Sequence, residues 1–131
     1  MENRKFIRFA EFGLITIFLL GIIFHVLVLF QVVDFKMVWG GKIKTISEMY
    51  TMETVSLLIN FIFLIIIILK GQNSKKGYSS KIITGSLWVM FSLFLLNTVG
   101  NLFSESMKET IIFTPITLLS SVFCFILVRN K

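Results

Sequence analysis

Charged side chains are scarce in this sequence. Only 15% of its 131 residues are charged and 56% are hydrophobic, whereas a soluble domain has about 25% charged and about 45–50% apolar residues. This composition excludes an ordinary soluble domain and is typical of a chain that lies in a lipid bilayer. The length allows one domain, residues 1–131, most of which is needed to cross the membrane, so we expect no soluble catalytic domain.

Cysteine, histidine and proline each occur once, as Cys124, His25 and Pro115. One cysteine cannot form an intramolecular disulfide or a thiolate metal cluster. The sequence also lacks a His/Cys/Glu set with metal-ligand spacing, a glycine-rich phosphate loop and a serine with an evident base partner. We therefore expect no metal or other cofactor, and the sequence favours a non-enzymatic role over an enzyme.

Long apolar runs, by contrast, are abundant. Four of them, near residues 7–32, 50–69, 82–103 and 108–128, reach the about 20 residues that a helix needs to cross a bilayer. The basic start, with Arg4, Lys5 and Arg8, resembles a signal sequence but has no small-residue cleavage site, so we expect an uncleaved first span. Because the connectors are short, the sequence predicts an all-α polytopic membrane protein, an antiparallel up-down four-helix transmembrane bundle.

The basic residues predict how this bundle is oriented. When each basic residue is assigned to the end of the apolar run that it lies near, nine fall on one side of the membrane and four on the other. The larger group is Arg4, Lys5, Arg8, Lys70, Lys75, Lys76, Lys81, Arg129 and Lys131, and the smaller is Lys36, Lys42, Lys44 and Lys108. Because positive residues are retained inside, we expect both termini in the cytoplasm and the chain in the inner membrane of a bacterium. The basic residues do not cluster as in a nucleic-acid module, so no nucleic-acid partner is expected.

The connectors carry three local signals. Ser106-Met107-Lys108-Glu109 has the pattern of a capping box, which predicts the start of the fourth helix and a tight third turn. Residues 71–77 are polar and begin and end with glycine, so we expect a plain flexible loop. In the first connector the largely apolar segment 35–39 precedes Gly40-Gly41, and we expect it to lie on the outer membrane interface.

Polar residues inside the runs repeat at helical spacing and predict which face of each helix is buried. The stripes are Glu11, Phe18, Gly21 and His25; Glu53, Ser56 and Asn60; Ser86, Met90, Leu93, Asn97 and Gly100; and Thr110, Thr114, Thr117, Ser121 and Cys124. Intramembrane polar groups usually face the interior of a bundle. With a rise of about 1.5 Å per residue, most of them fall in the outer half, whereas the inner half is apolar.

The sequence therefore predicts a polar, outward-facing pocket. Its candidate binding residues are His25, Glu53, Asn60, Asn97, Asn101, Thr114 and Thr117. Beside them, Pro115 removes the N–H that would bond the carbonyl of Ile111, so we expect a kink in the fourth helix. In lipid the freed carbonyl needs a donor, and an asparagine amide of the third helix is the nearest one.

Each of these residues also has a structural explanation. Asparagine and hydroxyl side chains often bond neighbouring helices, with about 0.6 kcal/mol for each bond. Glu53 lies in the first turn of its predicted helix, where a carboxylate suits the helix dipole and can pair with a lysine of the first connector, Lys42 or Lys44. Glu11 lies near the cytoplasmic boundary, and we expect it to pair with Arg8. His25 fits a neutral core histidine, but imidazole also changes its charge near neutral pH.

Three strings carry a resemblance to known proteins. Trp39-Gly40-Gly41-Lys42-Ile43, Asn97-Thr98-Val99-Gly100-Asn101-Leu102 and Thr114-Pro115-Ile116-Thr117 resemble strings in a group of small uncharacterised bacterial four-helix membrane proteins. The resemblance covers nearly the whole chain and implies no activity. In size and layout the chain is also similar to DoxX-type membrane proteins.

Two other four-helix classes do not match. Small multidrug exporters use a glutamate near the middle of their first helix, whereas Glu11 lies at the edge of the first run. Membrane glutathione-type enzymes use buried arginines, and this sequence has none between Arg8 and Arg129. We therefore expect a non-enzymatic transport-related, small-solute-binding or accessory component. The alternative is a membrane-embedded enzyme or a redox or complex subunit that uses His25 and Glu53. The expected partners are the lipid bilayer and either a second copy, as a homodimer, or a larger membrane complex.

Overall fold

The computed structural model describes residues 4–38, 42–104 and 107–130. Most of this part of the chain belongs to four helices, α1 (Arg4–Leu29), α2 (Ile46–Lys75), α3 (Lys81–Leu102) and α4 (Met107–Arg129). A short 3-10 helix, η1 (Phe35–Met37), lies in the connector between α1 and α2. The four α-helices are each long and apolar enough to cross a membrane, which confirms the predicted all-helical fold with four helices of this kind.

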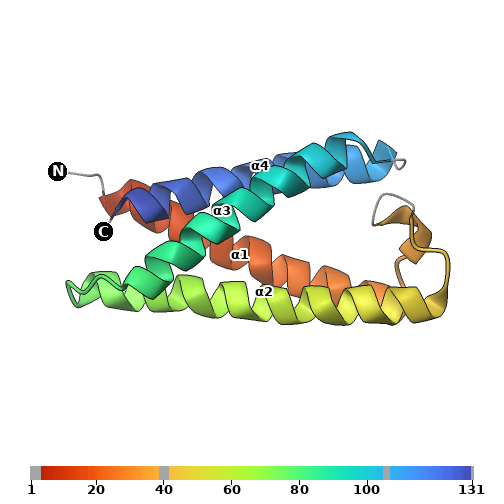
Figure 1. Ribbon diagram of the computed structural model, residues 1–131, viewed down its shortest axis with the longest axis horizontal. Helices are drawn as coiled ribbons and strands as arrows, with labels where there is room; N and C mark the ends of the chain where they lie inside the picture. The colour runs from red at the N-terminus through yellow and green to blue at the C-terminus, as the bar shows by residue number, and fades with distance from the viewer. Residues whose placement is uncertain (1–3, 39–41, 105–106, 131) are drawn as a thin grey trace.

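The helices form two pairs (Figure 1). α1 and α2 lie side by side, and α3 packs along α4. α1 also contacts α4, whereas α2 and α3 meet over a short stretch only, because α3 leaves the end of α2 and crosses obliquely towards α4. The start of α1 and the end of α4 lie at the same end of the molecule.

One buried cluster joins the four helices. It includes Leu14 and Phe18 of α1, Ile67 of α2, Leu87, Met90 and Phe94 of α3, and Phe123 and Leu127 of α4. In its middle the rings of Phe18, Phe63 and Phe94 meet in pairs, with all three centroid distances at 5.8 Å. Ring pairs at this separation add about 0.5–1.5 kcal/mol beyond the area that they bury. These three residues, which we call the aromatic triad, therefore hold α1, α2 and α3 together.

A second, smaller cluster lies beneath the first connector. Val38 and Ile43 of the connector are buried together with Val28 of α1 and Met49 of α2. The apolar segment 35–39 was expected at the outer membrane interface. Its Val38 side chain is buried, because the connector folds back against the two helices. Gly40-Gly41 and Trp39 of the same segment lie outside the described residues.

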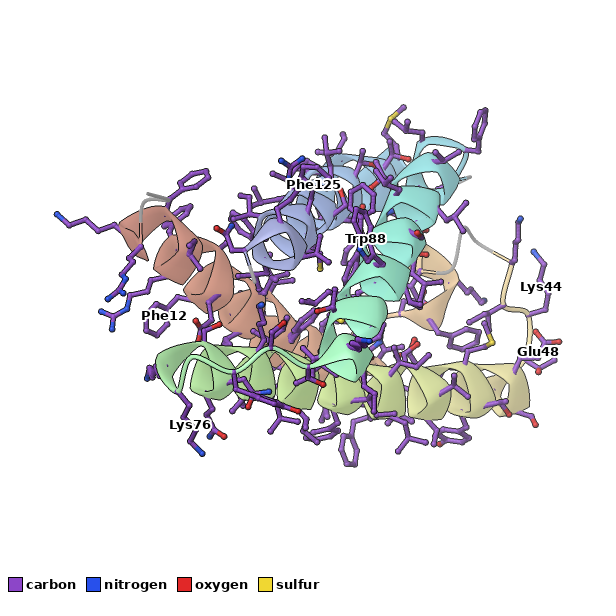
Figure 2. The ribbon with its side chains drawn as sticks, turned by 60° about the vertical axis from the view of Figure 1, so that its left-hand side comes forward. Phe12, Lys44, Glu48, Lys76, Trp88 and Phe125 are labelled. Carbon is purple, nitrogen blue, oxygen red and sulfur yellow. The ribbon has the colours of Figure 1, made fainter. Side chains whose placement is uncertain are left out.

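α2 begins four residues before the predicted start at residue 50. Thr45 caps it, since its hydroxyl accepts from the N–H of Glu48 at 3.1 Å, while the Glu48 carboxylate accepts from the N–H of Lys44 at 3.0 Å. This arrangement differs from a capping box in one bond: the Glu48 carboxylate accepts from the N–H of Lys44 and not from that of the capping residue Thr45. Figure 2 shows Lys44 and Glu48 together at this end of α2 and Lys76 at the opposite end.

α2 also continues past the predicted end, and the expected loop over residues 71–77 is largely wrong. Residues 71–75 are helical, and the helix ends in a Schellman motif: Tyr78 N–H donates to the carbonyl of Asn73 at 2.8 Å, and Gly77, with φ +71°, donates to Ser74. Gly77 supplies the left-handed residue that such an ending needs. Ser80 then caps α3 by accepting from the N–H of Ile83, so the connector is short.

The other helix ends differ from the sequence expectation in smaller ways. α1 ends at Leu29, three residues early, in a second Schellman motif whose left-handed residue is Gln31, at φ 59°. At the start of α4, Ser106 lies outside the described residues, and the Glu109 carboxylate accepts from the hydroxyl of Ser104 at 2.8 Å. α4 continues through Pro115 to Arg129.

Candidate functional site

The contact between α1 and α2 is built from two facing stripes of residues. On α2 the stripe is Glu53, Ser56, Asn60, Phe63, Ile67 and Lys70, and on α1 it is Glu11, Leu14, Phe18, Gly21 and His25. Both repeat at alternating spacings of three and four, which keeps them on one helix face. We call this contact the α1–α2 seam. His25 pairs with Glu53 at one end of the seam, and Glu11 lies against Gly71 at the other. Residue numbers on α1 therefore decrease in the direction in which those on α2 increase.

At one end of the seam the His25 imidazole and the Glu53 carboxyl group are hydrogen-bonded to each other. Nδ1 of the His25 ring donates to Oε2 of the Glu53 carboxylate. The Glu53 side chain is 0% exposed and that of His25 is 19% exposed. Removing a carboxylate from water is costly unless it is paired and hydrogen-bonded, so the imidazole and the carboxylate depend on each other. The structure pairs Glu53 with His25, whereas Lys42 and Lys44, the partners proposed from the sequence, are exposed residues of the connector.

The next layer of the seam is polar but uncharged. The amide nitrogen of Asn60 donates to the carbonyl of Ser56 at 2.9 Å, and the Ser56 hydroxyl donates to the carbonyl of Met52 at 2.9 Å. A Cβ placed on Gly21 would lie 2.8 Å from Oδ1 of Asn60. Glycine at position 21 therefore gives the amide room against the backbone of α1. The predicted faces of α1 and α2 are those that meet in this seam.

The middle of the seam is apolar. Phe18 and Phe63 face each other with ring centroids 5.8 Å apart, and Leu14 and Ile67 belong to the same buried cluster. Phe94 of α3 closes this part by contacting both rings of the pair. No ionisable side chain lies in the two stripes between His25 and Glu11 on α1, or between Glu53 and Lys70 on α2.

The far end of the seam carries charge again, which the sequence analysis missed. Lys70, expected in a loop, is 6% exposed, and its Nζ donates to the carbonyl of Asn130 at 2.6 Å. A cation there suits the carbonyl end of α4. Glu11 does not form the expected pair with Arg8, because its carboxylate lies directly against Gly71 of α2. The signal was available: Lys70 continues the α2 stripe at the spacing of Glu53, Ser56 and Asn60.

A second polar group lies between α3 and α4. The hydroxyl of Thr98 bonds that of Thr117 at 2.9 Å, and the Asn101 amide donates to Thr117 Oγ1 at 3.4 Å. Thr110 donates to the carbonyl of Asn101 at 2.6 Å. The predicted bond from an asparagine amide to Ile111 is therefore not formed by Asn101, because Thr117 is its partner. Thr114 Oγ1 is buried and has no hydrogen-bond partner among the described residues.

The structure thus distributes six of the seven predicted site residues over two interfaces. His25, Glu53 and Asn60 meet in the α1–α2 seam, and Asn101, Thr114 and Thr117 lie at the α3–α4 contact. Asn97 joins neither group. It is exposed, because the buried face of α3 runs through Leu87, Met90, Phe94 and Thr98. The predicted stripe of α3 is therefore wrong after Met90. Leu93 and Asn97 were predicted to be on the buried face, but Phe94 and Thr98 are buried instead.

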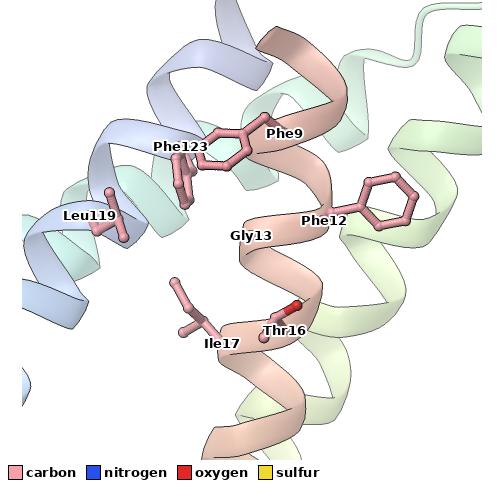
Figure 3. Close-up of a pocket in the computed structure, with 7 residues that line it drawn as sticks. All are labelled: Phe9, Phe12, Gly13, Thr16, Ile17, Leu119 and Phe123. Carbon is pink, nitrogen blue, oxygen red and sulfur yellow. The ribbon is translucent and has the colours of Figure 1, made fainter. Parts of the chain in front are cut away.

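An apolar groove lies on the opposite side of α1 from the seam (Figure 3). Its lining residues are Phe9, Phe12, Gly13, Thr16, Ile17, Leu119 and Phe123. The rings of Phe9 and Phe123 meet edge to face at 5.6 Å over one side of it, while Phe12 points away from them. The groove holds no ionisable side chain, so the ionisable groups of α1 and α2 remain the stronger candidate for chemistry.

The described residues contain no group of three or more His, Cys, Asp or Glu side chains able to hold a metal ion. Comparisons with known protein families, curated proteins and solved structures give no match.

Proposed function

We propose that this chain is an antiparallel up-down four-helix bundle of the bacterial cytoplasmic membrane, with both termini inside. The nine-to-four division of basic residues supports this orientation, as does the common end at which α1 begins and α4 finishes. In this orientation His25, Glu53 and Asn60 lie in the outer half, and Glu11 and Lys70 lie near the cytoplasmic side.

The orientation has a direct test. In a Cys124→Ala background, a membrane-impermeant maleimide added to intact cells should label Lys42→Cys, which replaces an exposed residue of the first connector. It should leave Lys76→Cys unlabelled until the cells are opened. The reverse pattern would overturn the orientation.

Within this bundle, the chain acts as a non-enzymatic, transport-related component that binds protons or a small polar solute from outside. The observation that carries this proposal is the His25–Glu53 pair. Hydrogen bonding between helices needs no ionisable group, and an ionisable residue inside a membrane is costly and usually functional. Imidazole and carboxylate are both groups that can accept, hold and release a proton.

The decisive measurement is infrared difference spectroscopy of the reconstituted protein during pH steps. If the pair is one proton site, the bands of the His25 imidazole and of the Glu53 carboxyl should change together, and His25→Gln should alter the Glu53 band. Glu48→Gln is the matched control, because that carboxylate is exposed and caps α2. Independent behaviour of the two bands would overturn the site.

Two other functions use the same residues differently. A membrane-embedded enzyme or redox subunit would use the His25–Glu53 pair as an acid and base on a bound substrate. An accessory subunit or homodimer would use its lipid-facing helices instead, and the pair would then be structural. Independent infrared bands would leave the accessory function in front.

A further inference from the structure

Ionisable groups occupy both ends of the α1–α2 seam, and this distribution goes beyond a single outer site. Glu53 and Gly71, the α2 residues at the two ends, are eighteen positions apart, which at about 1.5 Å per residue is about 27 Å. The hydrocarbon core of a bilayer is about 30 Å thick. The two polar ends therefore lie near opposite boundaries of the membrane while belonging to one continuous contact between the same two helices.

We propose that the α1–α2 seam is a proton path across the membrane, with the His25–Glu53 pair as its outer site, Glu11 as its inner site and the aromatic triad as its gate. This inference rests on the proposed function, since it takes the outer pair to be a proton site. A proton enters at the imidazole–carboxylate pair and leaves through the Glu11 carboxylate. No bond other than that of the proton is made or broken.

From the outer site towards the middle of the seam, ionisable groups give way to uncharged polar groups and then to apolar ones. Ser56 and Asn60 extend the outer site inward with hydroxyl and amide groups that can bond water. Gly21 keeps the Asn60 amide close to the backbone of α1. Beyond Asn60 the seam is closed by Phe18 and Phe63, so in the structure the outer and inner sites are separated by apolar side chains.

The gate can open by a movement between the two pairs of helices, which leaves each pair intact and shifts the contact of α1 with α4. Phe94, the third ring of the triad, comes from α3, which packs closely along α4 but meets α2 over a short stretch only. A small movement of the α3–α4 pair against the α1–α2 pair would therefore withdraw Phe94 and loosen the contact of Phe18 with Phe63. Water could then bridge Asn60 and the inner site.

The inner site is a carboxylate at the end of the seam that also holds a buried lysine. Glu11 faces Gly71 of α2, whose missing side chain leaves room for the carboxylate. The neighbouring Lys70 is buried and bonded to the carbonyl of Asn130 at 2.6 Å, and Arg8 lies one turn earlier on α1.

The test is proton flux into liposomes that contain the full chain and an internal pH-sensitive dye, with the membrane potential clamped by potassium and valinomycin. We expect an acid pulse to produce faster internal acidification than in protein-free vesicles. Glu11→Gln should slow this flux by about a hundredfold, the low end of what a positioned proton-transfer group contributes. Glu11→Asp should restore part of it, and Phe63→Ala should accelerate it.

Glu48→Gln is again the matched control and should conduct as the wild type does. Helix content and monodispersity of each variant show whether it folds, and the Glu11→Asp rescue separates a lost proton site from lost packing. Wild-type flux equal to that of empty vesicles, or unchanged flux in Glu11→Gln, would overturn the path. If flux is absent while the infrared bands of His25 and Glu53 still change together, the path fails and the proposed outer site stands.

Discussion

The two helix pairs of this molecule are held together by different chemistry. The α1–α2 seam contains His25, Glu53, Glu11 and Lys70, all partly or fully buried. The α3–α4 contact relies on hydroxyl and amide groups, with Thr98 and Thr117 at its centre. Both contacts are polar, but of the described residues the seam holds ionisable side chains at both of its ends, whereas on the α3–α4 side the buried carboxylate is Glu109, bonded to Ser104 of the connector.

The difference shows which polar residues need a functional explanation. At the α3–α4 contact, each hydroxyl proton has an alternative acceptor in its own helix: the carbonyl of Phe94 lies 2.8 Å from Thr98 Oγ1, and that of Phe113 lies 2.9 Å from Thr117 Oγ1. Such hydroxyls are satisfied within their own helices, so they cost little in lipid and their role is packing. Glu53 and Lys70 have no such low-cost arrangement, because a buried charge requires a specific partner. Stability alone therefore explains the α3–α4 contact better than it explains the seam.

The largest loss of stability is expected from removing one member of the His25–Glu53 pair. His25→Leu leaves the buried Glu53 carboxylate without its imidazole partner, and we expect the free energy of unfolding in detergent to fall by about 3–5 kcal/mol. SDS-induced unfolding followed by circular dichroism measures this change. The double variant His25→Leu/Glu53→Leu should recover most of the loss, since no charge is then left buried. A double variant as unstable as the single one would show that packing, not charge, accounts for the effect.

A smaller effect is expected from filling the close approach within the seam. Gly21→Ala places a methyl group against Oδ1 of Asn60, and overpacking of this kind costs about 1–3 kcal/mol, offset by about 1 kcal/mol from the better helix former. Gly85→Ala is the matched control in α3, because nothing lies within 4 Å of the added Cβ. It should stabilise the protein or leave it unchanged. Equal effects of the two substitutions in SDS unfolding would contradict the close approach.

The seam was also the part of the structure that the sequence predicted best. The spacing of Glu53, Ser56 and Asn60 identified the buried face of α2, because polar residues in an apolar run are strong markers of the interior. The same reasoning failed on α3, where Asn97 was taken as the marker. Thr98 is buried there instead, because its hydroxyl bonds the carbonyl of Phe94 within its own helix. In a helix that is apolar on nearly every side, one polar residue does not define the inner face.

The ends of α2 show a different reason for error. Lys70 and Gly71 look like the start of a loop when residues are judged by polarity alone, but both are buried in the helix. Gly71 is needed for the contact with Glu11, and the residue that ends the helix is Gly77, in the left-handed conformation. The capping pattern of Thr45 and Glu48 was equally readable. Pairing between distant residues, such as Lys70 with Asn130, is not readable from local sequence.

The α3–α4 contact should respond weakly to the loss of its central hydroxyl. Thr117→Val removes the acceptor of the Asn101 amide and the partner of Thr98 while nearly conserving volume. Hydrogen bonds between membrane helices average about 0.6 kcal/mol with a maximum near 1.7 kcal/mol, so we expect a loss in that range. The measurement is the same SDS titration, and the infrared signals of His25 and Glu53 should not change. A loss as large as that of His25→Leu would remove the distinction between the two contacts.

The smallest effect is expected at Asn97, which belongs to neither contact. The buried face of α3 passes through Phe94 and Thr98, and Asn97 is exposed beside it. A surface substitution away from packed or bonded groups usually changes stability by less than about 0.5 kcal/mol, so Asn97→Leu should unfold as the wild type does. Asn101→Leu is the matched control, since the same change there removes an amide bonded to Thr117 and should lower stability measurably. If Asn97→Leu proves the more damaging of the two, Asn97 is covered by something outside the single chain. Cross-linking in membranes through Asn97→Cys in a Cys124→Ala background would then identify a second copy, because two α3 helices of the same orientation hold residue 97 at the same depth.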